Sequence, residues 1–162
     1  MSEIKNIETN RTKNSKEIVK ISLTDKTNER TKYIRNRVKL LLDNPKVLPK
    51  YKNVLLRLYK KNAIYYTDES SAMATDRNGN KIIGNFFGTA DLRTNRIRIT
   101  GLAWESIQYR GEPSLEAEID FILLHETNHL ILKTTQHING YENFNKEIKD
   151  MNFWTYSEKQ EI

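Results

Sequence analysis

Residues 121–131 read Phe-Ile-Leu-Leu-His-Glu-Thr-Asn-His-Leu-Ile, an apolar run that contains the motif His125-Glu126-Thr127-Asn128-His129. Residues four apart lie one turn along the same face of an α-helix, with Cβ atoms about 5–6 Å apart. Two imidazoles with this spacing can bind one Zn²⁺ at about 2.0–2.1 Å. A Glu beside the first His can take a proton from a water on that metal. The stretch therefore predicts a helix with His125 and His129 as metal ligands and Glu126 as the catalytic general base.

The residues around the motif favour a buried metal site over a solvated helix face. Three apolar residues precede the motif and three follow it, and Glu126 is the only charged residue between Asp120 and Lys133. All three histidines of the chain lie between positions 125 and 137. A surface helix with two solvated histidines would instead carry polar residues around them.

The third metal ligand has several candidates. A catalytic zinc site holds three protein ligands and keeps one position open for water. The segment from Lys133 to Gln136 has the character of a helix end and a turn, which would let the chain fold back and favours His137. Glutamates more often lie on solvated helix faces, but many sites of this kind take a Glu from a following helix. The alternatives that remain open are Glu142, Glu147, Asp150 and Glu158.

The order of these features resembles the SprT-like metalloprotease domain, and more loosely the WLM-type and YgjP-type zincins. In the SprT-like pattern, a third His is followed by Gly, Phe, an apolar residue four positions later, and an apolar–Asn pair. The matching residues here are His137, Gly140, Phe144, Ile148 and Met151-Asn152. The resemblance covers about residues 63–152 and implies a zincin-like fold, bound Zn²⁺ and cleavage of protein or peptide substrates, in this family of proteins attached to DNA.

The sequence departs from the SprT-like pattern at one point. The family has its third His directly before Gly, whereas Ile138 and Asn139 separate His137 from Gly140 here. A strict alignment would put Asn139 at the ligand position, and because Asn is a poor zinc ligand we prefer a small insertion that keeps His137. The ImmA/IrrE-like zincins are a rival resemblance, in which the third ligand is a Glu further along the chain.

Composition limits the class of protein. A chain of 162 residues suggests a single domain with its own core. Cysteine is absent, which excludes disulfides, thiolate zinc fingers and cysteine nucleophiles. The first 20 residues lack the apolar segment of a secretory signal, and no apolar run approaches the ~20 residues of a membrane span. We therefore expect a cytoplasmic protein without a membrane partner.

The positive charge is concentrated in the N-terminal part. Residues 1–62 contain 17 Lys and Arg against 6 Asp and Glu, whereas residues 63–162 contain 10 against 15. A concentrated cationic surface favours phosphate backbones through release of counterions. The charge therefore suggests DNA or RNA as a partner of this part, with a solvated lysine-rich surface as the alternative.

Periodicity predicts an α+β domain with N-terminal helices, a small antiparallel-rich sheet and the motif helix. Residues 1–22 are polar and are expected to form a flexible arm, followed by one domain over 23–162. Helices are expected at about 25–43, with Ile34, Val38 and Leu41 inward, and at about 49–61, with Tyr51, Leu55 and Leu58 inward. Strands are expected at 63–67, 81–91 and 95–100, a polar loop at 70–80, and a short helix at 101–109.

These observations predict a zinc-dependent endopeptidase whose Glu126 activates water for attack on a peptide bond. The segment from Ile83 to Gly88 is the candidate sheet edge that would hold substrate as an added strand. At least one of Phe86 and Phe87 is expected to be buried in the core instead. A regulatory protease of the ImmA/IrrE type and a non-enzymatic nucleic-acid-binding or inhibitory protein on a zincin scaffold are the alternative functions.

Overall fold

Two helices joined by a short turn make up residues 15–60. The computed structural model describes residues 15–75, 78–105, 115–134 and 141–151, and of residues 15–23, 75, 141 and 142 the backbone alone. Helix α2 (Ser15–Asp43) begins ten residues before the expected position, because no Gly or Pro interrupts the chain between Ser15 and Asp25. Helix α3 (Pro49–Lys60) begins at its proline, as expected. The predicted inward residues of both helices are all buried.

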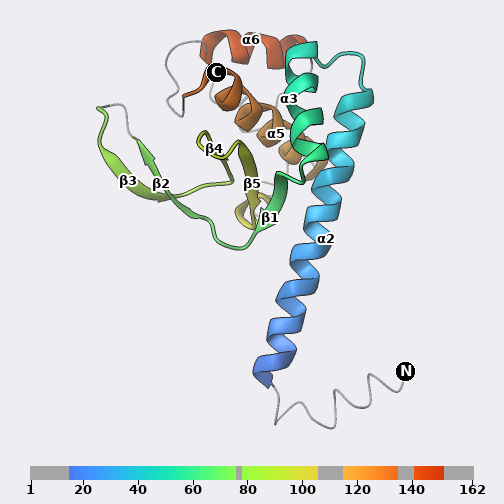
Figure 1. Cartoon of the computed structure of the whole chain (residues 1–162), viewed down its shortest axis with the longest axis vertical. Helices are drawn as coiled ribbons and strands as arrows, with labels where there is room; N and C mark the ends of the chain where they lie inside the picture. The colour runs from blue at the N-terminus through green and yellow to red at the C-terminus, as the bar shows by residue number, and fades with distance from the viewer. Residues whose placement is uncertain (1–14, 76–77, 106–114, 135–140, 152–162) are drawn as a thin grey trace.

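The main sheet has three strands in the order β1-β5-β4. Strand β1 (Ile64–Thr67) runs parallel to β5 (Arg96–Thr100), and β4 (Gly88–Asp91) runs antiparallel to β5. All described helices longer than one turn lie on one side of this sheet (Figure 1). Helix α2 packs on β1, and helix α5 (Leu115–Leu132) packs on β4 and β5. The domain is therefore α+β, as predicted.

The segment predicted as a polar loop contains a strand. Strand β2 (Ser71–Thr75) pairs with β3 (Lys81–Asn85) in a separate antiparallel hairpin, which projects beside the main sheet (Figure 1). The single strand predicted for 81–91 is therefore wrong, because the chain changes sheets at Phe86-Phe87. Here Phe86 N–H donates to Ser70 C=O and Thr100 N–H donates to Phe87 C=O, both at 2.9 Å. Phe86 is half-buried and Phe87 exposed, so neither joins the core.

The open edge of the main sheet is β4 rather than Ile83–Gly88. Phe87 and Thr100 are opposite each other and hydrogen-bonded, and such pairs alternate with non-bonded pairs along an antiparallel ladder. Gly88 and Ala90 therefore turn their backbone N–H and C=O groups away from β5. No described strand covers this side of β4. The edge can consequently accept a further extended segment.

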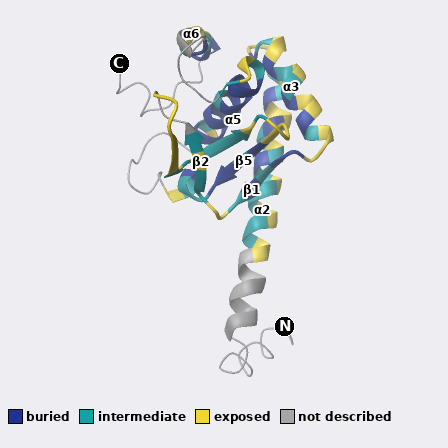
Figure 2. Ribbon diagram, turned by 60° about the vertical axis from the view of Figure 1, so that its left-hand side comes forward, coloured by how far each residue is buried: buried dark blue, intermediate teal, exposed yellow. Residues whose placement is uncertain are grey.

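Helix α5 is buried between the sheet and the other helices (Figure 2). It contacts α2, α3, β4, β5 and helix α6 (Tyr141–Met151). The predicted apolar stripe of α6 is buried at Phe144, Ile148 and Met151. None of the helices in the described ranges is both long enough and apolar enough to cross a membrane. The fold thus places the motif helix at its centre, with one turn of the helix reaching the open edge of β4.

Candidate metal centre

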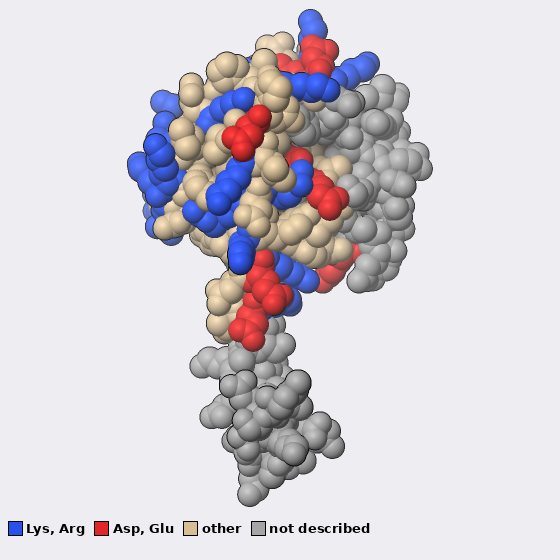
Figure 3. All heavy atoms as spheres, turned by 90° about the vertical axis from the view of Figure 1, so that its right-hand side faces the viewer, with Lys and Arg blue, Asp and Glu red and all other residues tan. Residues whose placement is uncertain are grey.

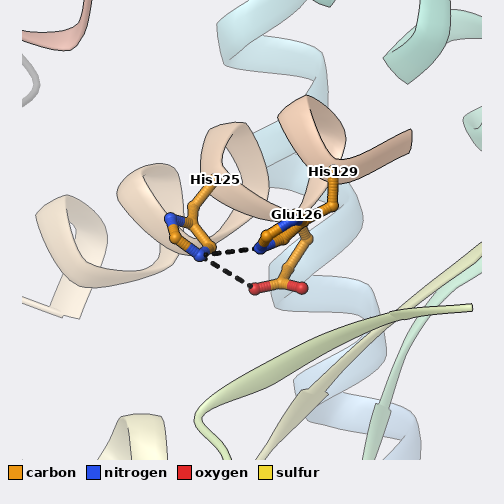
Figure 4. Close-up of side chains that lie close together, drawn as sticks. All are labelled: His125, Glu126 and His129. Atoms are coloured by element: carbon orange, nitrogen blue, oxygen red, sulfur yellow. Dashed lines mark hydrogen bonds and ion pairs between the residues drawn. The ribbon is translucent and has the colours of Figure 1, made fainter. Parts of the chain in front are cut away.

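His125, Glu126 and His129 lie together on the face of α5 that is turned toward β4 (Figure 4). The Nε2 atoms of the two imidazoles are 3.1 Å apart, and a carboxylate oxygen of Glu126 lies 3.8 Å from His125 Nε2. One potential ligand atom from each residue falls within 4.8 Å of the others. The predicted convergence of these three side chains is therefore confirmed among the described residues.

The ring of His129 is oriented by the end of its own helix. Lys133 has a positive φ of 56°, and the Thr134 N–H returns to the His129 carbonyl at 3.2 Å, which is a common way to end a helix. The chain reversal places Thr134 C=O 2.7 Å from His129 Nδ1. A carbonyl can only accept, so Nδ1 carries the hydrogen and Nε2 presents its lone pair. This tautomer is the one that binds a metal through Nε2.

Aromatic side chains hold the ring of His125. Phe121, one turn earlier on α5, stacks on it with ring centroids 5.8 Å apart, and Phe144 of α6 meets it edge-on at 5.5 Å. The two histidine rings are nearly perpendicular, at 83°. The stripe that packs α6 against α5 therefore also restricts the orientation of a predicted ligand.

Glu126 is buried beneath the strand edge. It is 7 % exposed, and burial raises the pKa of its carboxyl to about 8. Strand β4 can approach this closely because Gly88 has no side chain. A Cβ at Gly88 would lie 2.5 Å from Ile122 Cγ2 and 3.4 Å from Glu126 Cγ. A carboxyl with a pKa near neutrality is well suited to accept and return a proton.

The two histidines fit a tetrahedral metal ion. With Zn–N bonds of about 2.0–2.1 Å and a tetrahedral angle, two ligand nitrogens lie ~3.3 Å apart, close to the observed 3.1 Å between the Nε2 atoms. The Thr134 carbonyl on Nδ1 of His129 is an arrangement typical of a zinc-bound imidazole. The donor set is also suited to other divalent ions that accept imidazole nitrogen.

Of the five candidates for the third metal ligand, the structure describes the side chains of two. His137 and Glu158 lie outside the described residues, as does the side chain of Glu142. Glu147 is engaged elsewhere, since its carboxylate accepts from Tyr51 Oη at 2.8 Å and pairs with Lys50 Nζ at 2.7 Å. Asp150 is exposed on α6. Of the candidates described in full, neither therefore joins the pair of histidines.

A cleft of about 810 Å³ opens over the three motif residues. Its walls are β4, the start of the following turn and the β2–β3 hairpin, and we name it the β4 cleft. Sequence reasoning missed the hairpin wall, formed in part by Ala72 and Ala74, and missed Thr89 and Arg98 on the sheet, whereas Phe86 of the predicted edge does line the cleft. The alternation of Arg96, Ile97, Arg98 and Ile99 was the available signal for a basic outer sheet face.

The arrangement joins a possible metal site, a buried carboxyl group and an open strand edge in one cleft. Such a combination can activate water beside an extended chain that is held by its backbone. No protein-family model, no curated protein and no solved structure matches this chain.

Proposed function

We propose that this protein is a zinc-dependent endopeptidase of the zincin type. The main support for this function is the position of His125 Nε2 and His129 Nε2, 3.1 Å apart, next to the buried carboxyl of Glu126 at the floor of the β4 cleft. A structural metal site would not require an acid–base group at this position. His137 is the proposed third ligand.

The chemistry follows from the residues around the site. When bound, zinc would supply Lewis acidity, which lowers the pKa of a coordinated water and polarises the substrate carbonyl. Glu126 accepts a proton from the water that attacks the peptide carbonyl, and it then delivers this proton to the leaving nitrogen. Thr134 C=O keeps His129 in the required tautomer, and Phe121 and Phe144 keep the His125 ring in place.

Substrate would be held through its backbone at the edge of β4. Gly88 and Ala90 turn their N–H and C=O groups away from β5 along the cleft, where no described strand pairs with them, and an extended segment can add to such an edge as a further strand. Backbone pairing is independent of side-chain identity and requires an unfolded or flexible segment. This favours cleavage within loops or disordered regions of proteins.

The test compares wild type with Glu126→Gln, which keeps the shape of the side chain and removes the base. We expect both proteins to bind about one equivalent of zinc, and His125→Ala and His129→Ala to lose it. Glu126→Gln should lower cleavage by about 10²–10⁴-fold, which is the usual contribution of general acid–base catalysis. Elemental analysis measures the metal, and gel and mass-spectrometric analysis measure cleavage of unfolded and DNA-bound proteins.

Two results would contradict the proposal. Equal cleavage by wild type and Glu126→Gln would assign the activity to another site or to a contaminant. Zinc-loaded protein that cleaves none of the substrates, DNA-bound proteins included, would favour a non-enzymatic protein that uses the metal site as a scaffold. Wild type with chelator is the control for metal dependence.

A further inference from the structure

The outer face of the main sheet presents a row of polar side chains that ends at the cleft. Tyr65, Arg98 and Thr89 are directly opposite one another on β1, β5 and β4. Neighbours in such a row point to the same face of the sheet. Their neighbours Ile97, Ile99 and Gly88 face α5 instead, because Ile97 and Ile99 are buried and Gly88 abuts Ile122. The row therefore lies on the side away from the helices.

Arg98 extends along this row toward the open edge. Its Nε donates to Thr89 Oγ1 at 3.2 Å, so the side chain reaches Thr89 on β4. Both residues line the β4 cleft, and Arg98 is only half-exposed. The Arg98 side chain can therefore be reached from the cleft in which an added strand would lie. Neighbouring strands are about 4.8 Å apart, which is within reach of an arginine side chain held in this way.

The charges that line the same cleft favour an anionic ligand. Lys81 of the hairpin and Arg93 of the β4–β5 turn also line it. The lining holds two carboxyl groups against these three basic side chains: Glu126 at its floor, and Asp91, whose Oδ1 accepts from Arg93 N–H at 3.0 Å and Thr94 N–H at 3.2 Å within the turn. Hydrogen bonds from the Ser71 hydroxyl and from Ser71 N–H, the latter at 2.9 Å, lower the pKa of the Glu69 carboxyl, and nearby Arg98 lowers it further.

Strand pairing fixes which substrate side chain would meet Arg98. A substrate residue opposite Thr89 points to the outer face, whereas its two neighbours, opposite Gly88 and Ala90, point toward α5. Gly88 is the β4 residue that lies against Glu126. The residue that meets Arg98 is therefore next to the residue nearest the catalytic carboxyl.

We propose that the β4 cleft selects extended peptide segments that carry Asp or Glu at the residue opposite Thr89, with Arg98 binding that carboxylate. This inference rests on the proposed endopeptidase function and names its substrate class. Thr89 positions Arg98, and Lys81 and Arg93 strengthen the attraction of acidic segments to the cleft.

The experiment uses fluorogenic peptides with a mapped cleavage site and replaces Glu by Gln at each of three positions on either side. We expect one position, within two residues of the cleaved bond, where Glu raises kcat/KM by about 10- to 100-fold over Gln, the range expected for a charged hydrogen bond. Arg98→Gln should abolish this preference, so that the Glu and Gln peptides are cleaved with equal kcat/KM. Arg98→Glu should reverse the preference, so that a peptide with Lys at this position is cleaved better than the peptide with Glu.

Matched controls separate a direct contact from a general effect of charge or folding. Arg96→Gln removes the same charge from the same face of β5, opposite Asp91, and should keep the preference. Arg98→Lys should retain part of it. A preference absent from wild type, or one that persists in Arg98→Gln, would overturn the inference while the endopeptidase function stands.

A binding experiment distinguishes this inference from the proposed function. Fluorescein-labelled Glu and Gln peptides are titrated against Glu126→Gln protein by anisotropy, with and without Arg98→Gln. Tighter binding of the Glu peptide that depends on Arg98 supports the inference even if no peptide is cleaved. Equal binding overturns it. Stronger, Arg98-dependent binding of a short single-stranded oligonucleotide would also overturn it, in favour of a nucleic-acid groove.

Discussion

Single residues determine the chemistry of the candidate site through their local contacts. His129 has a defined tautomer because the helix ends three residues later and Thr134 C=O meets its Nδ1. Gly88 allows a strand to lie against Glu126, because any side chain at this position would overlap Ile122. Two predictions belong to this scale, one about the third ligand and one about the buried carboxyl.

We predict that His137→Ala weakens zinc binding by at least about 100-fold, whereas Glu147→Ala leaves it almost unchanged. Loss of one of three ligands should cost several kcal/mol, given about 10–16 kcal/mol for structural zinc sites. Glu147 already binds Tyr51 and Lys50, so its removal should instead affect the contact between α3 and α6. Competition with a chromophoric chelator measures the affinity. Metal loss in Glu142→Ala or Glu147→Ala would favour the ImmA/IrrE-like arrangement.

We predict that the zinc-free protein is less stable at pH 9 than at pH 6. Burial raises the pKa of Glu126 from about 4.5 to about 8. A raised pKa in the folded state contributes stability below the unfolded value, and this contribution is lost as the pH rises through about 8. The loss should be on the order of a few kcal/mol. Urea unfolding with chelator measures it, and Glu126→Gln should remove the difference. An unchanged pH dependence in that variant would assign the effect to other groups.

Pairs of helices are joined by polar contacts as well as by the apolar core. Arg37 of α2 binds Asp120 of α5 through two hydrogen bonds, at 3.0 and 2.7 Å. Burial raises the pKa of Asp120 more than Arg37 lowers it. The carboxylate therefore depends on Arg37 to remain charged inside the protein. This contact holds the motif helix against the long N-terminal helix.

We predict that Arg37→Leu destabilises the protein by on the order of 3 kcal/mol, because it leaves a buried carboxylate without its partner. The double variant Arg37→Leu, Asp120→Leu should recover most of this loss, since the uncompensated charge is then absent. Exposed Arg57 provides the control, and Arg57→Gln should change stability by less than about 0.5 kcal/mol. Urea unfolding curves measure all four proteins. A loss in Arg37→Leu no greater than in Arg57→Gln would show that the pair contributes little.

At the scale of the whole molecule, basic side chains predominate over acidic ones on the face that α2 and α3 form (Figure 3). Part of this charge is used within the fold. Lys26 pairs with Asp68, and the Arg30 guanidinium lies over the rings of Tyr66 and Trp104. Arg35 likewise lies over Tyr59. Other basic side chains of this part of the chain are exposed and available for a phosphate backbone, among them Lys32, Lys46, Arg57, Lys60 and Lys61.

We predict salt-sensitive binding of duplex DNA to this face. Each phosphate neutralised adds about −0.9 to the slope of log affinity against log salt concentration. Replacing Arg57, Lys60 and Lys61 by Ser should reduce the magnitude of the slope by up to about 2.7. Replacement by Ser of Lys146 and Lys149, which are exposed on α6, is the control and should leave the slope unchanged. Anisotropy titrations at several salt concentrations measure the slope. Absence of binding at low salt would leave the charge as a solvated surface.

The sequence by itself determined those features that depend on neighbours along the chain. The spacing of His125 and His129 fixes their common helix face, and apolar periodicity marks the buried stripes of α2, α3 and α6. Helical hydrogen bonds and side-chain periodicity involve residues three and four apart, so these elements can be recognised from local sequence.

The tertiary structure alone decided the features that depend on distant residues. Strand β2 was predicted as a loop, since this short segment between polar residues becomes a strand only by pairing with β3. The break at Phe86-Phe87 and the exposed edge of β4 follow from pairing with β5 and from packing of Gly88 against α5. The contact between Arg37 and Asp120 joins residues 83 positions apart. Such contacts depend on which surfaces the packed elements bring together, and no local pattern encodes that choice.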